Sequence, residues 1–328
     1  MTDAFDAVLP PRLPAPVEAE AFAPSNIALA KYWGKRDAGL NLPLNSSLSV
    51  SLADWGTHTR VTPAERDVTV FNGQVLGDVD PFSAKVFTFV ERFRRGQHLP
   101  LRVETTNSIP TAAGLASSAS GFAALVLALG DCFQLALPRE TLSMLARFGS
   151  GSATRSLWQG FVRWDRGRRP DGRDSHARPL DTHWADFRIA VVPVDTGPKA
   201  RSSRDGMGHT VATSPLYPGW PDRAEADCDA MEAAVRSRDF DTLGPLAEAN
   251  ALAMHATMFS ARPSLIYLKV RSWQMLERLW QAREDGLSAY ATMDAGPNVK
   301  VLFLGSEEAA VATLFPEARI IAPFAHSS

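Results

Sequence analysis

The amino-acid sequence predicts a mixed α/β protein, because segments with the periodicity of strands and of helices follow one another along the whole chain. Residues 47–52 and 101–105 alternate apolar and polar side chains, as half-buried strands do. Residues 80–95 carry apolar side chains at helical spacing. A buried strand at 187–194 is followed by long helical segments at 222–238, 239–257 and 264–284.

The length of the chain allows one large domain or two medium ones, since it has 328 residues. We place a subdomain boundary just before the strand at 187–194. Residues 18–184 then form an N-terminal subdomain and residues 185–328 a C-terminal one. Prolines at 10, 11 and 14 fall within residues 1–17, and we expect this segment to form a loose leader.

The composition is that of an ordinary globular protein, with 45% hydrophobic and 21% charged residues. A formal net charge of -2 argues against bulk binding to nucleic acid or to an acidic membrane, so an anion site must be a local cluster of cations. Cys132 and Cys228 match no metal spacing or redox pair. With neither a signal peptide nor an apolar membrane span in view, we expect a cytoplasmic protein with no membrane partner.

An extended segment begins at Glu18 and turns at Gly34. Three cations, Lys31, Lys35 and Arg36, lie around this turn. Such a run of charge is often just a solvated face. Here it leads through a polar turn into the strand at 47–52, and loops at strand ends are where ligands are usually held. Strand-like residues continue from 58 to 71, where Phe71-Asn-Gly-Gln74 signals a hairpin.

Residues 105–125 are rich in Ala, Gly and Ser, follow the strand at 101–105 and open into an apolar helix that runs to about Leu129. Small side chains let a ligand approach the backbone, and the first amides of a helix have no partner inside the helix. The segment therefore suits the phosphates of a nucleotide, although close packing of two helices would favour the same composition. It is not a Walker A loop, because no Gly-Lys-Ser/Thr follows at the required spacing.

A second glycine-rich turn, residues 149–160, lies between a helix at 138–148 and a strand at 161–164. Two of its serines, Ser150 and Ser152, and Arg155 suit a carboxylate or phosphate, because a guanidinium offers a planar fork of donors. A hydroxyl-capped helix start with a surface arginine is the alternative. We assign the polar residues 166–178 to solvent.

The C-terminal part holds a cationic loop at 199–207 and two strands at 287–293 and 299–304. Asp294 stands at the entrance of the tight turn between these strands. Aspartate is common at such places simply because its side chain bonds nearby backbone amides, so its position alone does not make it functional.

Five segments of the chain, taken together, resemble the diphosphomevalonate decarboxylase family of the GHMP kinase superfamily. They occur in the family's order and span most of the chain: residues 24–37, 110–124, 149–156, 202–207 and 293–298. The resemblance implies a GHMP-kinase-like α/β fold with an N-terminal half like ribosomal protein S5, a ferredoxin-like C-terminal half, and the active site in the cleft between them. It also implies a homodimer.

The implied activity is that of a lyase of the mevalonate pathway, in isoprenoid biosynthesis. With ATP and Mg²⁺, (R)-5-diphosphomevalonate would be phosphorylated on its 3-hydroxyl and then decarboxylated to isopentenyl diphosphate, releasing ADP, phosphate and carbon dioxide. A substrate with a carboxylate at one end and a diphosphate at the other needs two separate cationic sites. Arg155 suits the first, and Lys35 with Arg204 suits the second.

The motif match also implies roles for individual residues. The catalytic residues would be Asp294, Arg155 and Lys31. Substrate-binding residues would be Tyr32, Lys35, Ser150, Ser152, Arg155, Arg204 and Met207. ATP would contact Asn26, Pro110, Ala112, Ala113, Gly114, Leu115, Ala116, Ser117 and Ser118, with the hydroxyls of Ser117 and Ser118 also serving Mg²⁺.

The sequence departs from the family pattern at a few positions: Thr154 stands where Cys is common, Ala30 where a larger aliphatic residue is usual, and Lys199-Ala-Arg201 where two adjacent lysines are usual. The last change lies near the phosphates and leaves two sister activities open, decarboxylation of the 5-monophosphate and 3-phosphorylation without decarboxylation. A non-catalytic ligand sensor on the same scaffold is a more remote alternative, because no catalytic group is lost.

Overall fold

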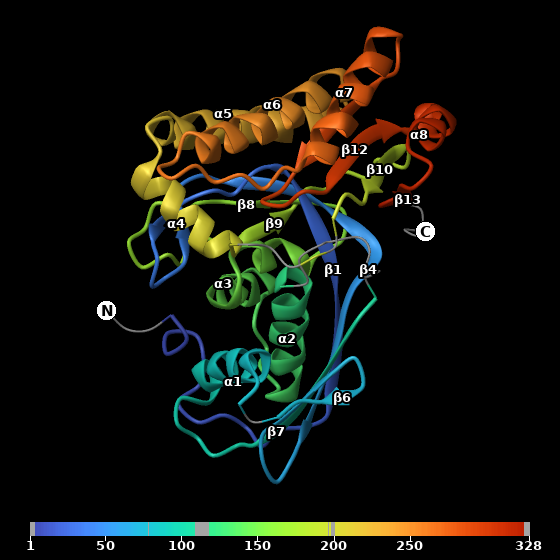
Figure 1. Cartoon of the computed structure of the whole chain (residues 1–328). Helices are drawn as coiled ribbons and strands as arrows, with labels where there is room; N and C mark the ends of the chain where they lie inside the picture. The colour runs from blue at the N-terminus through green and yellow to red at the C-terminus, as the bar shows by residue number, and fades with distance from the viewer. Residues whose placement is uncertain (1–3, 78, 109–117, 196, 198–200, 325–328) are drawn as a thin grey trace.

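The computed structural model describes residues 4–77, 79–108, 118–195, 197 and 201–324. Figure 1 shows two halves stacked one above the other, with β1 and β4 running from the lower half into the upper one. The prediction of an α/β fold with two subdomains is confirmed. Within the described ranges, no helix is both long and apolar enough to span a bilayer.

The N-terminal half is built on a seven-stranded sheet with three helices packed against it. Its strands are β1 (Ala19–Ala30), β4 (Ser47–Pro63), β5 (Val68–Phe71), β6 (Gln74–Val75), β7 (Leu101–Asn107), β8 (Phe161–Trp164) and β9 (Ala177–Pro179). The helices are α1 (Pro81–Arg94), α2 (Ser118–Cys132) and α3 (Arg139–Gly149), followed by the 3₁₀ helix η2 (Gly151–Leu157). A small hairpin of β2 (Lys35–Asp37) and β3 (Leu42–Pro43) stands apart.

The long strand β4 organises this sheet. It pairs antiparallel with β1 along one edge, and along the other with β8 at its beginning and β7 at its end. Residues 57–63 of β4 meet β7, and residues 47–50 meet β8. The sequence suggested two separate strands here, and the structure joins them into one because partners on both edges supply hydrogen bonds along its length.

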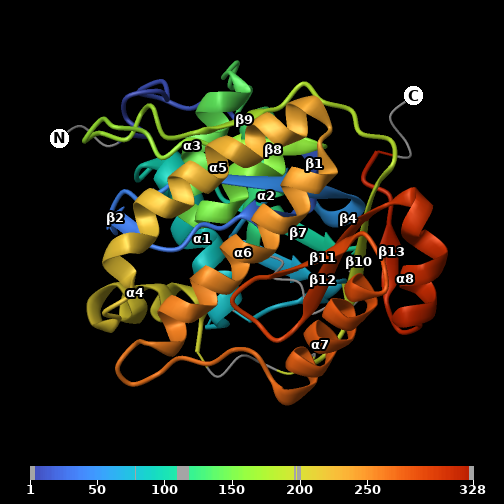
Figure 2. The ribbon, with the colours of Figure 1, turned by 90° about the horizontal axis from the view of Figure 1, so that it is seen from above.

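The C-terminal half has a four-stranded antiparallel sheet in the order β11-β12-β10-β13, covered by helices (Figure 2). The strands are β10 (Phe187–Val192), β11 (Ala289–Met293), β12 (Val299–Leu304) and β13 (Arg319–Ile321). The helices are α4 (Ser203–Thr213), α5 (Trp220–Ser237), α6 (Phe240–Phe259), α7 (Val270–Glu284) and α8 (Glu308–Leu314), with short 3₁₀ turns at Tyr217–Gly219 (η3) and Gly305–Glu307 (η4).

Several predicted elements are confirmed, among them the hairpin at residues 71–74, where Phe71 pairs with Gln74. Two predictions are wrong in part. The helix expected from 264 begins at Val270. The segment 166–178, assigned to solvent, ends in β9. Ser175 within it is fully buried, and its hydroxyl accepts a hydrogen bond from the Trp164 indole at 3.1 Å.

Residues 4–17, the described part of the segment predicted to be a loose leader, pack against the N-terminal half instead. Phe5 is 1% exposed, and its ring contacts the rings of Phe89, Phe93 and Phe148 at centroid distances of 6.2, 5.3 and 5.3 Å. Further along, the amide of Val17 donates to the carbonyl of Cys132 at 2.9 Å. This segment therefore completes the hydrophobic core between α1 and α3.

We expect Phe5→Ala to destabilise the protein by about 3 kcal/mol, because it leaves a cavity in a packed aromatic cluster. Urea unfolding followed by fluorescence measures the change. Ile266→Ala serves as the control, since that side chain is 63% exposed. A loss of less than about 1 kcal/mol for Phe5→Ala would show that the segment does not contribute to the core.

Candidate active site

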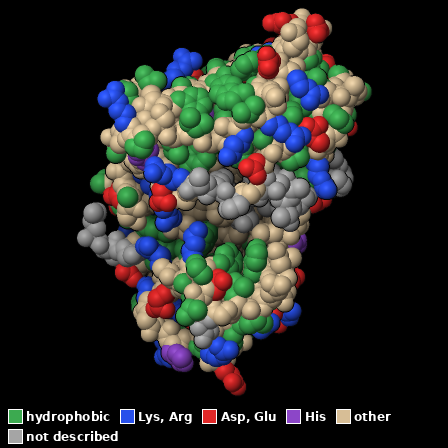
Figure 3. Space-filling view, viewed as in Figure 1, with side chains coloured by type: hydrophobic (Ala, Val, Ile, Leu, Met, Phe, Trp, Pro, Cys, Tyr) green, Lys and Arg blue, Asp and Glu red, His purple; other side chains and the backbone are tan. Residues whose placement is uncertain are grey.

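A cavity of about 330 Å³ lies between the two halves and is lined by residues from both. Figure 3 shows the molecule hollowed at mid-height, with Lys and Arg side chains beside the hollow. The N-terminal half contributes the end of β1, the turn at 149–152 and the start of α2. The C-terminal half contributes α4 and the turn between β11 and β12.

Asp294 faces this cavity from the turn after β11, and two ammonium groups bind its carboxylate. Lys31 Nζ donates to Oδ1 and Lys300 Nζ to Oδ2, both at 2.9 Å. The two lysine side chains are 2% and 4% exposed, whereas that of Asp294 is 38% exposed. Burial alone raises the pKa of Asp294, but Lys300 and Lys31 together hold it well below its ordinary value. Asp294 is therefore ionised at neutral pH.

The backbone of Asp294 is also held. Its carbonyl accepts from the amide of Gly296 at 2.7 Å and lies 3.2 Å from Nε2 of His255 on α6. Burial, and the nearby Lys31, lower the pKa of His255 to about 4. The imidazole is thus neutral at pH 7, and it donates to the carbonyl if the proton is on Nε2.

Lys31 follows the last residue of β1, where polar side chains fix its backbone. Its amide donates to Asn250 Oδ1 at 2.8 Å, and its carbonyl accepts from Asn45 Nδ2 at 2.8 Å. Burial lowers the pKa of Lys31 to about 8, although Asp294 opposes this effect. Its ammonium group also donates to the carbonyl of Ala28 at 2.7 Å.

Arg155 lies in η2 and is 3% exposed. Nη1 donates to Ser47 Oγ at 2.6 Å and Nη2 to Asn26 Oδ1 at 3.3 Å. Asn26 is itself oriented, because its amide donates to Ser156 Oγ at 2.7 Å. Burial lowers the pKa of Arg155 to about 10, so it remains a cation. Its Nε has no hydrogen-bond partner among the described residues, which leaves a buried donor for a ligand anion.

The remaining substrate-binding residues implied by the resemblance all line the same cavity: Tyr32, Lys35, Ser150, Ser152, Arg204 and Met207. Burial and the neighbouring Arg204 lower the pKa of Lys35. The hydroxyls of Ser150 and Ser152 are 3.1 Å apart. The buried hydroxyl of Tyr32 finds no partner in the described part of the chain. Arg36, in contrast, points away from the cavity and donates to the carbonyls of Arg166 and Arg169.

Of the residues implied for ATP, the structure brings Asn26 and Ser118 to the cavity. Ser118 is the first described residue of α2. A second, mostly apolar cavity of about 210 Å³ shares Ser118 and Lys85 with the first and is lined by rings of Phe82 and Phe122. The other implied residues lie outside those that the structure describes: Pro110, Ala112, Ala113, Gly114, Leu115, Ala116 and Ser117.

The described residues contain no group of three or more His, Cys, Asp or Glu side chains that could by themselves hold a metal ion. Magnesium in phosphoryl-transfer sites usually keeps few protein ligands and binds oxygens of the substrate phosphates. The hydroxyl of Ser118, at the edge of the cavity, is an oxygen donor of the right kind. The donor set therefore fits Mg²⁺ that arrives with a nucleotide.

Sequence reasoning missed three side chains near this site: Lys300, Lys85 and His255. Lys300 had a visible signal, because a lone lysine inside the apolar strand Val299–Leu304 must be paired if it is buried. Lys85 is an ordinary-looking residue of helix α1, and His255 lies in a long apolar helix. Only the fold brings these two near the cavity.

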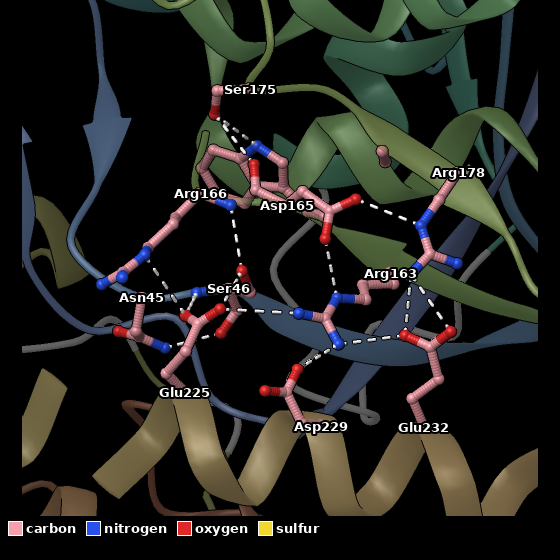
Figure 4. Close-up of polar contacts among 12 residues, drawn as sticks. Asn45, Ser46, Arg163, Asp165, Arg166, Ser175, Arg178, Glu225, Asp229 and Glu232 are labelled. Carbon is pink, nitrogen blue, oxygen red and sulfur yellow. Dashed lines mark hydrogen bonds and ion pairs between the residues drawn. The ribbon is translucent and has the colours of Figure 1, made fainter. Parts of the chain in front are cut away.

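An ion-pair network joins the two halves (Figure 4). Arg163 on β8 donates to Asp229 and Glu232 on α5 at 2.7 and 3.0 Å. Glu225, on the same helix, accepts from the amide of Ser46 at 2.6 Å. Ser46 follows Asn45, which binds the carbonyl of Lys31, so the network fixes the wall that carries this lysine.

Comparisons with known proteins agree across both halves. A family model described as the diphosphomevalonate decarboxylase-like N-terminal domain matches residues 23–177, and one described as the mevalonate 5-diphosphate decarboxylase C-terminal domain matches residues 189–321. The diphosphomevalonate decarboxylase mvd1 of Aspergillus fumigatus is 37% identical in an alignment of 328 positions that covers 88% of this chain and 78% of that protein.

Solved structures are similar over nearly the whole chain. A structure of MDDEF in complex with MVAPP, AMPPCP and magnesium has a TM-score of 0.87 and 39% identity, covering 93% of this chain and 96% of that one. A mevalonate diphosphate decarboxylase from Enterococcus faecalis has a TM-score of 0.85 and 38% identity, with the same coverage. The GHMP-kinase-like fold that the motifs implied is confirmed. The chain belongs to the diphosphomevalonate decarboxylase family.

Proposed function

We propose that this protein catalyses the ATP-dependent decarboxylation of (R)-5-diphosphomevalonate to isopentenyl diphosphate, with release of ADP, phosphate and carbon dioxide. One observation carries the proposal within the family. The carboxylate of Asp294, ion-paired with Lys31, shares a cavity with the buried guanidinium of Arg155 and with the cations Lys35 and Arg204. These are the groups that a substrate with a reacting hydroxyl, a carboxylate and a diphosphate requires.

In this proposal Arg155 binds the substrate carboxylate. Its buried position and its unpartnered Nε support that role, because a desolvated guanidinium gains most from a carboxylate. Lys35 and Arg204 bind the diphosphate. Their positive charges repel each other, and an anion bound between them would relieve this repulsion, which supports the assignment. Tyr32, Ser150, Ser152 and Met207 complete the pocket.

The nucleotide is proposed to enter beside Ser118, with its phosphates between α2 and Lys31. The apolar second cavity suits its base, since Phe82 and Phe122 offer ring faces. Asn26 would orient groups where the phosphates meet the substrate. Mg²⁺, held by the phosphates with Ser117 and Ser118, would supply neutralising charge for the transferred phosphoryl group.

The reaction then follows from positions and charges. Asp294 accepts a hydrogen bond from the 3-hydroxyl, whose oxygen forms a bond to the γ-phosphorus as the bond to ADP breaks. The hydroxyl proton passes to an oxygen of the transferred phosphoryl group and leaves with it as phosphate. The C3–O bond next breaks with departure of phosphate, and the C1–C2 electron pair forms the new double bond as carbon dioxide leaves. Arg155 orients the departing carboxylate, and Asp294 stabilises positive charge at C3.

The closest alternatives act on related substrates, 5-phosphomevalonate or mevalonate itself. Asp294 disfavours a kinase that stops at the 3-phosphate, because its charge serves the second step. Lys35 and Arg204 favour a diphosphate. A ligand sensor without activity is disfavoured because no catalytic group is missing.

A substrate panel tests the proposal. We expect release of ¹⁴CO₂ from C1-labelled diphosphomevalonate with ATP and Mg²⁺ to exceed release from the monophosphate by at least about tenfold in kcat/KM, since the second phosphate adds charge-assisted hydrogen bonds. Mevalonate should give no release. Equal or faster release from the monophosphate would overturn the substrate assignment, and ATP hydrolysis without carbon dioxide would indicate the kinase.

We further propose that the protein acts as a homodimer in the cytoplasm, as the resemblance predicts. Light scattering after size exclusion should then give twice the chain mass of 35.6 kDa. A mass equal to that of one chain would contradict the dimer.

A further inference from the structure

The side chain of Lys300 has no role in the reaction described above, yet it binds the carboxylate at its centre. Lys300 Nζ lies 2.9 Å from Asp294 Oδ2, opposite the 2.9 Å contact of Lys31 with Oδ1. Lys300 is 3% exposed and lines the cavity. Burying a lysine is costly, so a charge at this depth needs a partner and usually serves a purpose.

The register of β12 explains how Lys300 reaches this place. β12 lies between β10 and β11, with Lys300 opposite Val191 on one side and Thr292 on the other. Val299 and Val301 point to the core of the C-terminal half. Because side chains alternate along a strand, Lys300 and Leu302 point the other way, toward the N-terminal half and the cavity. Asp294 follows β11 two residues after Thr292, so the sheet itself sets the distance between the two groups.

The carboxylate is thus held at both oxygens by groups from different parts of the fold. Lys31 comes from the end of β1 in the N-terminal half, and Lys300 comes from the C-terminal sheet. Arg155 from η2 also interacts electrostatically with Asp294, and His255 from α6 lies 3.2 Å from the Asp294 backbone carbonyl. With only one of the lysines, the carboxylate could rotate about its Cβ–Cγ bond, and its second oxygen would lose its donor.

We propose that Lys300 is a positioning residue for the reaction, which fixes the rotation of the Asp294 carboxylate and keeps it charged as the C3 cation forms. This inference rests on the proposed function, because it concerns the step at the 3-hydroxyl. It assigns Asp294 to orienting the hydroxyl and stabilising charge, since both of its oxygens already accept ammonium hydrogen bonds. The low pKa of Asp294 agrees with a weak base.

A double-mutant cycle tests the inference. We expect Lys300→Met to lower kcat for diphosphomevalonate by about 10- to 100-fold, with KM changed less than about threefold, because the lost interaction acts on the transition state. In an Asp294→Asn background the same change should alter single-turnover release of ¹⁴CO₂ less than about threefold. Lys269→Met on the exposed start of α7 is the matched control and should leave kcat unchanged.

A conservative variant, Lys300→Arg, distinguishes loss of positioning from misfolding. Lys300→Arg keeps the cation and should retain more kcat than Lys300→Met or Lys300→Gln, while all three bind diphosphomevalonate with a Kd near that of the wild type. An equal loss from Lys300→Met with and without the Asp294 carboxylate, or an unchanged kcat, would overturn the inference. If the wild type itself fails to release carbon dioxide from diphosphomevalonate, the proposed function fails instead.

Discussion

Replacing Asp294 by alanine should lower kcat by about 10³-fold or more, while the Kd for diphosphomevalonate changes by less than about threefold. The carboxylate orients the reacting hydroxyl and stabilises charge that exists only as the C3–O bond breaks, so its loss raises the barrier more than it weakens binding. Steady-state kinetics and calorimetric titration separate the two effects.

The substitution also leaves Lys31 and Lys300 without the carboxylate they share. We therefore expect some loss of thermal stability, which must be measured beside activity. Asp181→Ala is the control, because that residue is exposed and does not line the cavity. Turnover by Asp294→Ala equal to that of the wild type would remove Asp294 from the mechanism.

Arg155→Lys should reduce kcat/KM for diphosphomevalonate by about 10²- to 10³-fold, although the charge is kept. The guanidinium donates to Ser47 and Asn26 and still has an unpartnered Nε for the substrate. A single ammonium group cannot make all of these hydrogen bonds at once. Either Ser47 and Asn26 or the substrate carboxylate therefore loses its donor. Both kcat and KM should suffer, because binding and orientation depend on the same fork.

Arg139→Lys provides the matched control for this change, since Arg139 is exposed at the start of α3. The Kd for ATP should stay within about threefold of the wild type in both variants, because Arg155 serves the acid substrate. A kcat/KM of Arg155→Lys within about twofold of the wild type would contradict a role for the fork.

The sequence alone was enough to predict the short strands that are bounded by turn residues. Its motifs, which are far apart along the chain, also predicted which residues belong to the site. The strands Phe161–Trp164 and Val299–Leu304 have the predicted bounds, because each is a compact apolar run between polar or glycine-containing turns. The motif match named residues from both halves without any knowledge of distance. Its roles for those residues remain predictions, although the fold brings the described ones to one cavity.

Other features depend on tertiary partners that a sequence pattern does not reveal. The continuity of β4 through Ala53 and Gly56 depends on hydrogen bonds to neighbouring strands, not on local preference. The docking of the N-terminus had a weak signal in Phe5, Leu9 and Leu13, spaced four apart, which the surrounding prolines obscured. The sequence marks Lys300 as a residue that needs a partner if it is buried, but only the fold identifies that partner as Asp294.

A hydrophobic cluster shared by the two halves limits how the chain can be divided. Leu48 and Val50 of β4 and Ile27 of β1 pack in the same cluster as Ile189 and Leu302 of the C-terminal sheet. A fragment that begins at residue 185 would therefore expose its own members of this cluster to water. One family model ends at residue 177 and the other begins at residue 189, although the hydrophobic cluster continues across this boundary. We therefore expect the halves to unfold as one cooperative unit, and circular permutation or split-protein designs should keep β4 with its partners β1, β7 and β8.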